Sequence, residues 1–398
     1  QKNHPDNIMA VYYLGSVYLE KGDIEKAEEC FEKALAQRPG FDAAYFNIGL
    51  IRELKGNVEE AEEYYNKAIE LNPHNLQARE RLAQIYFKQK ETERAIEQYQ
   101  KISAHLPVNI DVHTNLGILY FENKEYDKAI EEFRIVLEAR PDNISIRYYL
   151  AVTLSELERD EEAVSQLKEI IARDPKNIGA FLYLGYLYSK LNMDNEAITV
   201  YEEILSFEKG NPDVYIYLAV HYIQKKDFAR AEEILKDALN RFENNDEIYF
   251  NIAVVYEKTD RQDEMVNSLK KTLQINPDHA DALNYLGYTY ADKGINLEEA
   301  FSLVRKALEL KPDSGYIMDS MGWVYYKMGK YKEARELLQK AVESVKDDPI
   351  VLEHMGDVYK SLGLIDKAKE FWEKALEFHE KSEDENLKER VEKKIQES

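Results

Sequence analysis

Apolar residues recur along this chain at spacings of three and four, in blocks that come back every 34 residues. Residues 110–143 show two such runs: Leu116, Leu119 and Tyr120, then Ala129, Ile130, Phe133 and Leu137. Side chains three and four apart lie on one face of a helix. Gly, Asn or Asp separates the two runs, and Pro usually separates one block from the next. Each block therefore predicts two amphipathic helices joined by a short turn.

A fixed set of residues marks each block. In the first block these are Val11, Leu14, Gly15, Tyr18, Ala27, Phe31, Ala34 and Pro39. The small residues Gly15 and Ala27 lie where the two helices would cross, so they are expected to keep the helices close. The register predicts eleven units: 8–41, 42–75, 76–109, 110–143, 144–177, 178–211, 212–245, 246–279, 280–314, 315–348 and 349–382. The ninth unit has one extra residue, in the turn after Gly294.

This period and these markers closely resemble the tetratricopeptide repeat (TPR). The resemblance implies an all-α fold: an α-solenoid in which helical hairpins wind into a right-handed superhelix with a concave groove. Solenoids end in a helix with a polar outer face, and residues 383–398 predict this C-terminal capping helix, because Leu387, Val391 and Ile395 are four apart. Residues 1–7 read as the tail of a truncated preceding repeat, so the chain is expected to be a fragment of a longer protein.

Composition narrows the function classes. The net charge is −23 with no basic cluster, and such an acidic surface repels phosphate backbones, so nucleic acid is not an expected partner. No apolar run approaches the length of a membrane span, and no transmembrane segment is expected. The histidines and the single cysteine lack the spacing of a metal site, and no catalytic motif is present. We therefore expect no enzyme activity, no cofactor and no metal in this chain.

A candidate binding surface follows from repeat positions 5 and 9, counted from the first residue of each unit. Helical geometry turns this stripe of the first helix toward the groove. Units five to eight are apolar at both positions, and an exposed apolar strip of this length is typical of a binding surface. The predicted groove residues are Tyr148, Val152, Leu182, Tyr186, Ile216, Val220, Phe250, Val254, Tyr288 and Trp323. The alternative is that part of this apolar area only packs neighbouring repeats together.

Acidic residues at position 2 add a second feature to the groove: Asp111, Asp213, Glu247 and Asp281. The expected partner is a protein or peptide with apolar anchors and basic residues. Three cationic or titratable residues, Arg79, His113 and Arg147, occupy position 4, where other units are apolar. Two interpretations are open for them. Either the aliphatic part of each side chain packs while its polar group stays in water, or the three residues form an anion-binding patch. No unit has Lys at position 5 or Asn at position 9, so the carboxylate clamp of some TPR domains is not expected.

These features favour a non-catalytic protein–protein interaction scaffold that holds a partner peptide or helix in the groove. Two alternatives stay open: a self-associating structural protein, hence a homo-oligomer, and a regulatory or substrate-binding part of a larger enzyme. The stretch 282–291, followed by Ser320-Met-Gly-Trp323, resembles repeats of bacterial, often exported or lipid-anchored, TPR proteins. That resemblance favours the bacterial cell envelope, periplasmic or lipid-anchored, over the cytoplasm. The sequence names neither the partner nor its binding direction.

Overall fold

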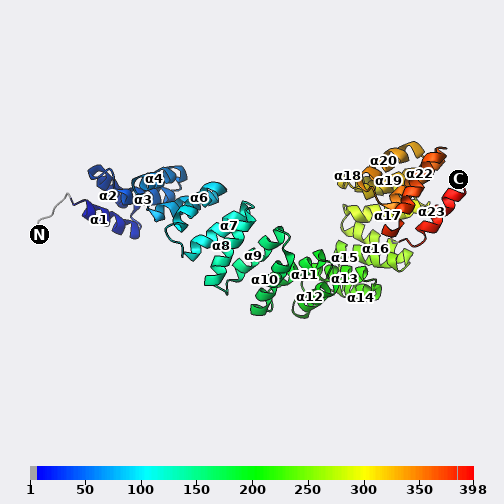
Figure 1. Ribbon diagram of the computed structural model, residues 1–398, viewed down its shortest axis with the longest axis horizontal. Helices are drawn as coiled ribbons and strands as arrows, with labels where there is room; N and C mark the ends of the chain where they lie inside the picture. The colour runs from blue at the N-terminus through cyan, green and yellow to red at the C-terminus, as the bar shows by residue number, and fades with distance from the viewer. Residues whose placement is uncertain (1–6, 383) are drawn as a thin grey trace. The chain divides into compact units, whose positions relative to one another are not determined.

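The computed structural model describes residues 7–382 and 384–398, and these residues form α-helices, one short 3₁₀ helix and connecting turns without a β-strand. The chain divides into two compact units, one ending at Met193 and one beginning at Asp194. Figure 1 labels most of the helices, which are numbered in chain order. The helices of the first unit are α1 (Ile8–Glu20), α2 (Ile24–Gln37), α3 (Asp42–Leu54), α4 (Val58–Leu71), α5 (Leu76–Lys88), α6 (Thr92–Ser103), α7 (Ile110–Glu122), α8 (Tyr126–Ala139), α9 (Ile144–Glu156), α10 (Asp160–Arg173) and α11 (Ile178–Lys190).

The second unit continues the same pattern and ends in one additional helix. Its helices are α12 (Asp194–Phe207), α13 (Pro212–Gln224), α14 (Phe228–Leu239), α15 (Asp246–Lys258), α16 (Gln262–Ile275), α17 (Ala280–Asp292), α18 (Leu297–Leu310), α19 (Gly315–Lys327), α20 (Tyr331–Ser344), α21 (Pro349–Ser361), α22 (Ile365–Glu377), η1 (His379–Lys381) and α23 (Leu387–Gln396). The predicted all-α solenoid of helical hairpins with a C-terminal cap is therefore confirmed. Within the described residues, no helix is long and apolar enough to cross a membrane.

The two helices of a repeat pack closely because a small residue lies at their crossing. A Cβ atom on Gly15 would lie 2.9 Å from the ring of Phe31, and one on Gly49 would lie 2.6 Å from the ring of Tyr65. Ala27, on the facing helix of the first repeat, is fully buried. These distances leave no room for a larger residue, which confirms the steric role expected of the small positions.

Asparagine starts many of the first helices. Its side-chain oxygen accepts a hydrogen bond from a backbone N–H of the first turn, which satisfies a donor that the helix itself leaves unpaired. Such caps lie at Asn7, Asn75, Asn109, Asn143, Asn177, Asn211 and Asn245. Among the described residues, the expected Pro stands two residues before the capping Asn in four of these turns: Pro73, Pro107, Pro141 and Pro175.

The capping helix α23 covers the apolar end of the last repeat. Leu387 and Val391 are buried and pack with Met355, Val358 and Trp372 in one apolar cluster. This side of α23 is the apolar face expected from the four-residue spacing. The predicted tail of a preceding repeat falls on residues 1–7, and of these only Asn7, the cap of α1, lies within the described residues.

Candidate protein-binding groove

The predicted groove residues of the first unit lie on α9 and α11. Tyr148, Val152 and Leu182 are half-buried, and Tyr186 is 53% exposed. The ring of Tyr183 stacks on that of Tyr186, with centroids 5.7 Å apart, and its centroid lies 5.9 Å from that of Tyr148. The three rings form an aromatic row. Tyr183 stands at repeat position 6, outside the two positions chosen from the sequence.

The second unit carries the other groove residues on α13, α15 and α17. Ile216, Val220, Phe250, Val254 and Tyr288 are all half-buried. Burial raises the pKa of the Tyr288 phenol, and nearby carboxylates raise it further. We call the half-buried and exposed residues the groove strip: Tyr148, Val152, Leu182 and Tyr186 in the first unit, with Ile216, Val220, Phe250, Val254 and Tyr288 in the second.

Trp323 does not belong to the groove strip, because the structure buries it. Its indole is 7% exposed and stacks on His354, with ring centroids 3.9 Å apart, and on Tyr326, with centroids 4.7 Å apart. Its Nε1 donates a hydrogen bond to Asp292 Oδ1 over 3.3 Å. Trp323 thus packs α17, α19 and α21 together. At this position the apolar side chain therefore packs neighbouring repeats together and does not line an accessible groove.

A cavity of about 420 Å³ opens beside the strip of the second unit, and we call it the inner cavity. First helices of successive repeats, α15, α17, α19 and α21, supply nearly all of its walls. The lining residues are Phe250, Asp281, Asn284, Tyr285, Tyr288, Tyr316, Asp319, Ser320, Asp348, Ile350 and Val351. Two groove-strip residues, Phe250 and Tyr288, are among them. The strip therefore borders a space large enough to hold a side chain.

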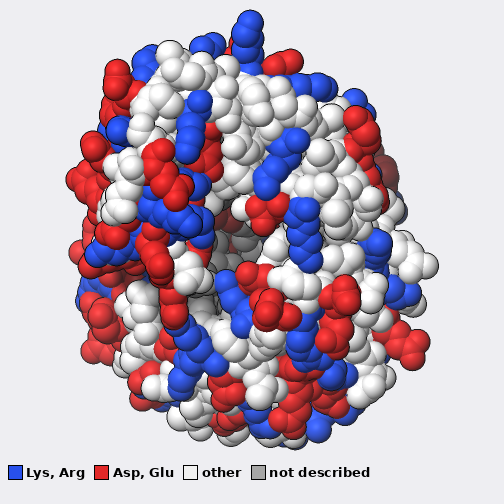
Figure 2. Space-filling view, turned by 90° about the vertical axis from the view of Figure 1, so that its right-hand side faces the viewer, with Lys and Arg blue, Asp and Glu red and all other residues white. Residues whose placement is uncertain are grey.

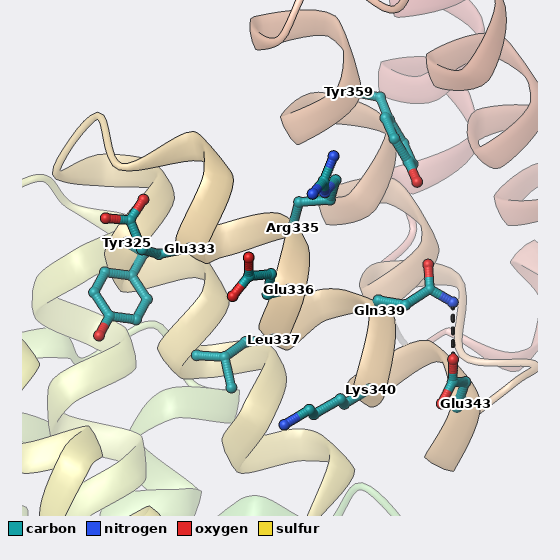
Figure 3. A pocket seen from close by; sticks show the side chains of 9 residues that line it. All are labelled: Tyr325, Glu333, Arg335, Glu336, Leu337, Gln339, Lys340, Glu343 and Tyr359. Carbon is teal, nitrogen blue, oxygen red and sulfur yellow. Dashed lines mark hydrogen bonds between the residues drawn. The ribbon is translucent and has the colours of Figure 1, made fainter.

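Charges of both signs are interspersed over the face shown in Figure 2, so neither Lys and Arg nor Asp and Glu form a continuous field there. A larger cavity, of about 740 Å³, lies along the outer helix α20 (Figure 3). Its lining is Tyr325, Glu333, Arg335, Glu336, Leu337, Gln339, Lys340, Glu343 and Tyr359. This lining is mostly charged, carries both signs and includes no groove-strip residue. Such a surface is typical of a solvated outer face, so the inner cavity is the stronger candidate site.

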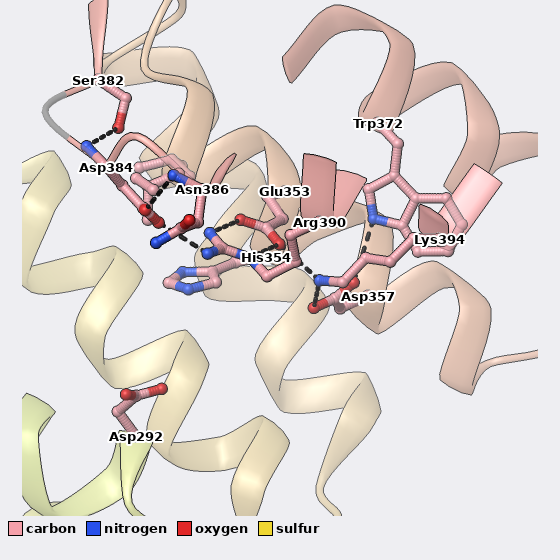
Figure 4. A network of polar contacts seen from close by, with 12 residues as sticks. Asp292, Glu353, His354, Asp357, Trp372, Ser382, Asp384, Asn386, Arg390 and Lys394 are labelled. Carbon is pink, nitrogen blue, oxygen red and sulfur yellow. Dashed lines mark hydrogen bonds and ion pairs between the residues drawn. The ribbon is translucent and has the colours of Figure 1, made fainter. Parts of the chain in front are cut away.

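The groove positions of the last repeat are occupied by the capping helix. Arg390 donates to both carboxylate oxygens of Glu353, over 2.7 and 2.6 Å, as Figure 4 shows. Lys394 Nζ lies 2.6 Å from Glu353 and 2.6 Å from Asp357. Asp357 also accepts from Trp372 Nε1 over 3.1 Å. Glu353 and Asp357 stand at positions 5 and 9, so the polar character of this repeat is explained by basic residues of the same chain.

Sequence comparison identifies the repeat. Models described as tetratricopeptide repeat match residues 12–75, 54–119, 120–185 and 181–387. The last of these matches spans more than half of the chain. The chain belongs to the TPR family. A search of the curated proteins finds no match to it.

Solved structures share the TPR fold at low sequence identity. The APC/C hetero-tetramer Cut9–Hcn1 is 14% identical, with a TM-score of 0.51 over 97% of this chain and 90% of that one. The C-terminal part of a TPR repeat-containing protein from Cytophaga hutchinsonii is 20% identical, with a TM-score of 0.50 over 61% of this chain and 98% of that one. Yeast Tom70 is 14% identical, with a TM-score of 0.44 over 99% and 96%. At these identities the likeness concerns the fold alone.

The titratable residues at position 4 of three TPR units have internal partners. Arg79 Nη1 donates to Gln98 Oε1 over 3.0 Å, and its Nη2 donates to the Pro73 carbonyl over 3.0 Å. His113 and Arg147 repeat this arrangement, each with the equivalent residue of its own second helix and with the Pro carbonyl at the end of the preceding repeat. Those contacts are His113 with Glu132 and the Pro107 carbonyl, and Arg147 with Gln166 and the Pro141 carbonyl.

The structure contradicts a solvated charged group at two of these three positions, whereas Arg147 is half-buried. Arg79 and His113 are buried, so their polar heads are not in water. The three side chains tie a first helix to the preceding turn and to the second helix of the same repeat, so an anion-binding patch is not assigned to them. His221, at position 10 of the seventh unit, is also buried, with Nδ1 2.9 Å from Asp194 Oδ1.

One group in the described part of the chain brings possible metal ligands together: Asp246, Glu247 and His279, with ligand atoms within 4.8 Å of one another. His279 Nδ1 accepts a hydrogen bond from the Ala282 N–H over 3.2 Å and caps α17. Accepting through Nδ1 leaves the ring proton on Nε2, which faces Glu247 at 3.4 Å. Asp246 accepts from Asn276 Nδ2 over 2.7 Å. The group is thus explained by helix capping, and no metal is assigned to it.

Proposed function

We propose that this chain is a non-catalytic protein-interaction scaffold that binds a partner peptide or helix through groove-strip residues. The TPR solenoid is typical of protein–protein interaction scaffolds. The observation that carries the proposal is the inner cavity, whose walls include the groove-strip residues Phe250 and Tyr288. A concave space with apolar walls and a few polar groups is the usual form of a binding site.

The exposure of aromatic rings on first helices supports the proposal. Tyr186, Tyr217 and Tyr316 are exposed, although each stands on a helix whose other large apolar side chains are buried or half-buried. Exposed aromatic rings are enriched at protein interfaces, because they bury a large area with little loss of side-chain entropy. Among similar folds, Cut9 is found in a hetero-tetramer with Hcn1.

A selection for binding peptides tests the proposal. Random peptides are selected on the purified chain, and the dissociation constants of synthetic copies are measured by calorimetry. A groove variant changes Tyr186, Val220 and Val254 to Ser. A matched outer variant changes exposed apolar residues of second helices to Ser: Leu71, Ile135 and Leu310. Circular dichroism checks that both variants fold.

Selected peptides are expected to bind the groove variant at least about tenfold more weakly than the native chain, a loss of about 1.4 kcal/mol. The outer variant is expected to keep the native affinity. Equal affinity for both variants, or the failure to select any peptide, would contradict a groove-binding scaffold.

The exposed apolar face of α1 favours a second candidate function, self-association. Val17 is 42% exposed, whereas Ile51, at the same position of the second repeat, is fully buried. Met9, Tyr13 and Leu14 extend this exposed face. Sedimentation at increasing concentration tests it: the native chain should form a larger species that Tyr13→Ser/Val17→Ser abolishes. A monomer at all concentrations would exclude self-association through α1.

The compartment is a separate proposal. On the resemblance of the ninth and tenth repeats, we infer a bacterial cell envelope protein, either periplasmic or lipid-anchored. Fractionation of the source cells tests this inference, and recovery of the chain with the cytoplasmic fraction would contradict it.

A further inference from the structure

The polar groups that line the inner cavity are dominated by hydrogen-bond acceptors. Three carboxylates line it: Asp281 on α17, Asp319 on α19, and Asp348, which caps α21 by accepting from the backbone N–H groups of Ile350 and Val351. No described lining residue is Lys or Arg. Asn284 adds a buried side-chain oxygen that has no hydrogen-bond partner among the described residues. A buried acceptor without a partner is costly, and a ligand that supplies a donor would remove that cost.

Aromatic rings form much of the remaining wall: Phe250, Tyr285, Tyr288 and Tyr316. A cation over an aromatic face is attracted by the ring quadrupole, and the attraction grows when water is excluded. Carboxylates beside aromatic rings are therefore complementary to a positively charged side chain. The raised pKa of Tyr288, to which the Asp319 carboxylate contributes after burial, is consistent with a negative potential here.

Basic side chains of this chain already contact two of the acids around the cavity. Lys311 Nζ lies 2.8 Å from both oxygens of Asp281, and both partners of this pair are about half exposed. His354 Nδ1 lies 2.9 Å from Asp319 Oδ1. Neither Lys311 nor His354 lines the cavity itself. An exposed ion pair of this kind contributes little to stability, so a partner's cation can replace Lys311 without much loss.

The capping helix shows how a basic helix meets acidic groove positions. Arg390 and Lys394, four residues apart on α23, contact Glu353 and Asp357 at positions 5 and 9 of the last repeat. Asp319, in the cavity wall, stands at position 5 of the preceding repeat. Asp319 is itself buried and paired with His354, so the exposed acid that a second basic segment can reach in the cavity is Asp281.

We propose that the inner cavity is a subsite for a basic side chain of the partner, with arginine as the best occupant. The planar guanidinium stacks on aromatic rings and donates several hydrogen bonds in one plane, which matches the aromatic wall, Asp281 and the Asn284 oxygen. This inference rests on the proposed groove-binding function and states which residue of the bound peptide is recognised.

The probe for the subsite is N-acetyl-L-arginine amide, titrated against the full chain by saturation-transfer NMR at about 0.15 M salt. N-acetyl-L-citrulline amide has nearly the same shape without the charge and serves as the reference ligand. The test variants are Asp281→Asn and Tyr316→Leu, both at exposed side chains of the cavity wall. The matched control is Asp111→Asn, because Asp111 also stands at position 2 and pairs with a basic residue of its own repeat, Arg140, but lines no described cavity.

The arginine probe is expected to bind about tenfold more tightly than the citrulline probe, and each test variant should reduce this preference several-fold. The control variant should leave it unchanged, which separates the subsite from general attraction to an acidic chain. Equal binding of the two probes, or an equal effect of the control, would overturn the subsite.

The two experiments distinguish a wrong arginine subsite from a wrong peptide-binding function. If selected peptides bind the groove strip but tolerate citrulline in place of each arginine, the scaffold stands and the subsite is wrong. If the arginine probe prefers the cavity while no peptide can be selected, the subsite stands and the peptide-binding function is wrong.

Discussion

Replacing Arg390 and Lys394 together by Met is expected to destabilise the end of the array that α23 caps by about 3–5 kcal/mol. The magnitude follows from Glu353, whose side chain is 3% exposed and whose hydrogen-bond partners within the described residues are Arg390 and Lys394. Without them a carboxylate stays buried and uncompensated, which costs much more than the loss of an exposed ion pair. Adding Glu353→Met should recover most of the lost stability, since the buried charge is then gone.

Tryptophan fluorescence in urea measures this effect locally. The chain has two tryptophans, Trp323 and Trp372, and both are buried in the last two repeats. Their emission therefore reports unfolding of the capped end rather than of the whole array. Because repeat arrays need not unfold in two states, the midpoint and slope of this one transition are compared among variants.

Lys388→Met/Lys393→Met is the matched control, because it removes two charges from exposed positions of the same helix. It should change stability by no more than about 0.5 kcal/mol. The reasoning is refuted if the control and the Arg390/Lys394 variant shift the midpoint equally. It is also refuted if the triple variant is no more stable than the double one.

Two further perturbations address the same end of the chain. Burial raises the pKa of Glu353, but Arg390 and Lys394 outweigh burial, so the net shift of this pKa is downward. The stability that the Glu353 carboxylate contributes is therefore lost as pH falls below about 4.5. For His354 the neighbouring carboxylates outweigh burial and raise the pKa. The stability that protonated His354 contributes is therefore fully present below about pH 6.5 and is lost at higher pH. The urea midpoint reported by tryptophan should thus peak between these values, and a flat profile would contradict both assignments. Gly356→Ala places a Cβ 2.4 Å from the Trp372 ring and should cost about 1–3 kcal/mol, whereas Gly40→Ala, with open space around it, should be nearly neutral in the thermal melt.

Much of the fold could be predicted from the sequence because each helix pair depends on neighbours within one repeat. The spacing of Leu116 and Leu119 defines a buried face, and both are buried in the structure. The same locality explains the cap, since the four-residue spacing of Leu387 and Val391 shows an apolar face without reference to the rest of the chain. Periodicity is a reliable guide wherever the contacts it implies are local.

The site was less predictable, because its contacts join residues from different repeats. Trp323 and Val254 both stand at position 9, so the repeat pattern predicts the same exposure for them. In the structure His354, 31 residues further along, covers the Trp323 indole. From its repeat position alone, Glu353 would be an accessible polar groove residue. In the structure Arg390 binds its carboxylate. Position alone identifies a helix face, whereas exposure depends on the neighbouring helix.

Hydrogen exchange of the chain saturated with a selected peptide tests the groove assignment most directly. The account predicts that the peptide slows exchange in first helices that carry the groove strip, at residues 144–156, 178–190, 212–224, 246–258 and 280–292. Outer helices such as α8 and α14 should exchange as in the free chain. Protection confined to the outer helices, or no protection at peptide saturation, would contradict a binding site in the groove.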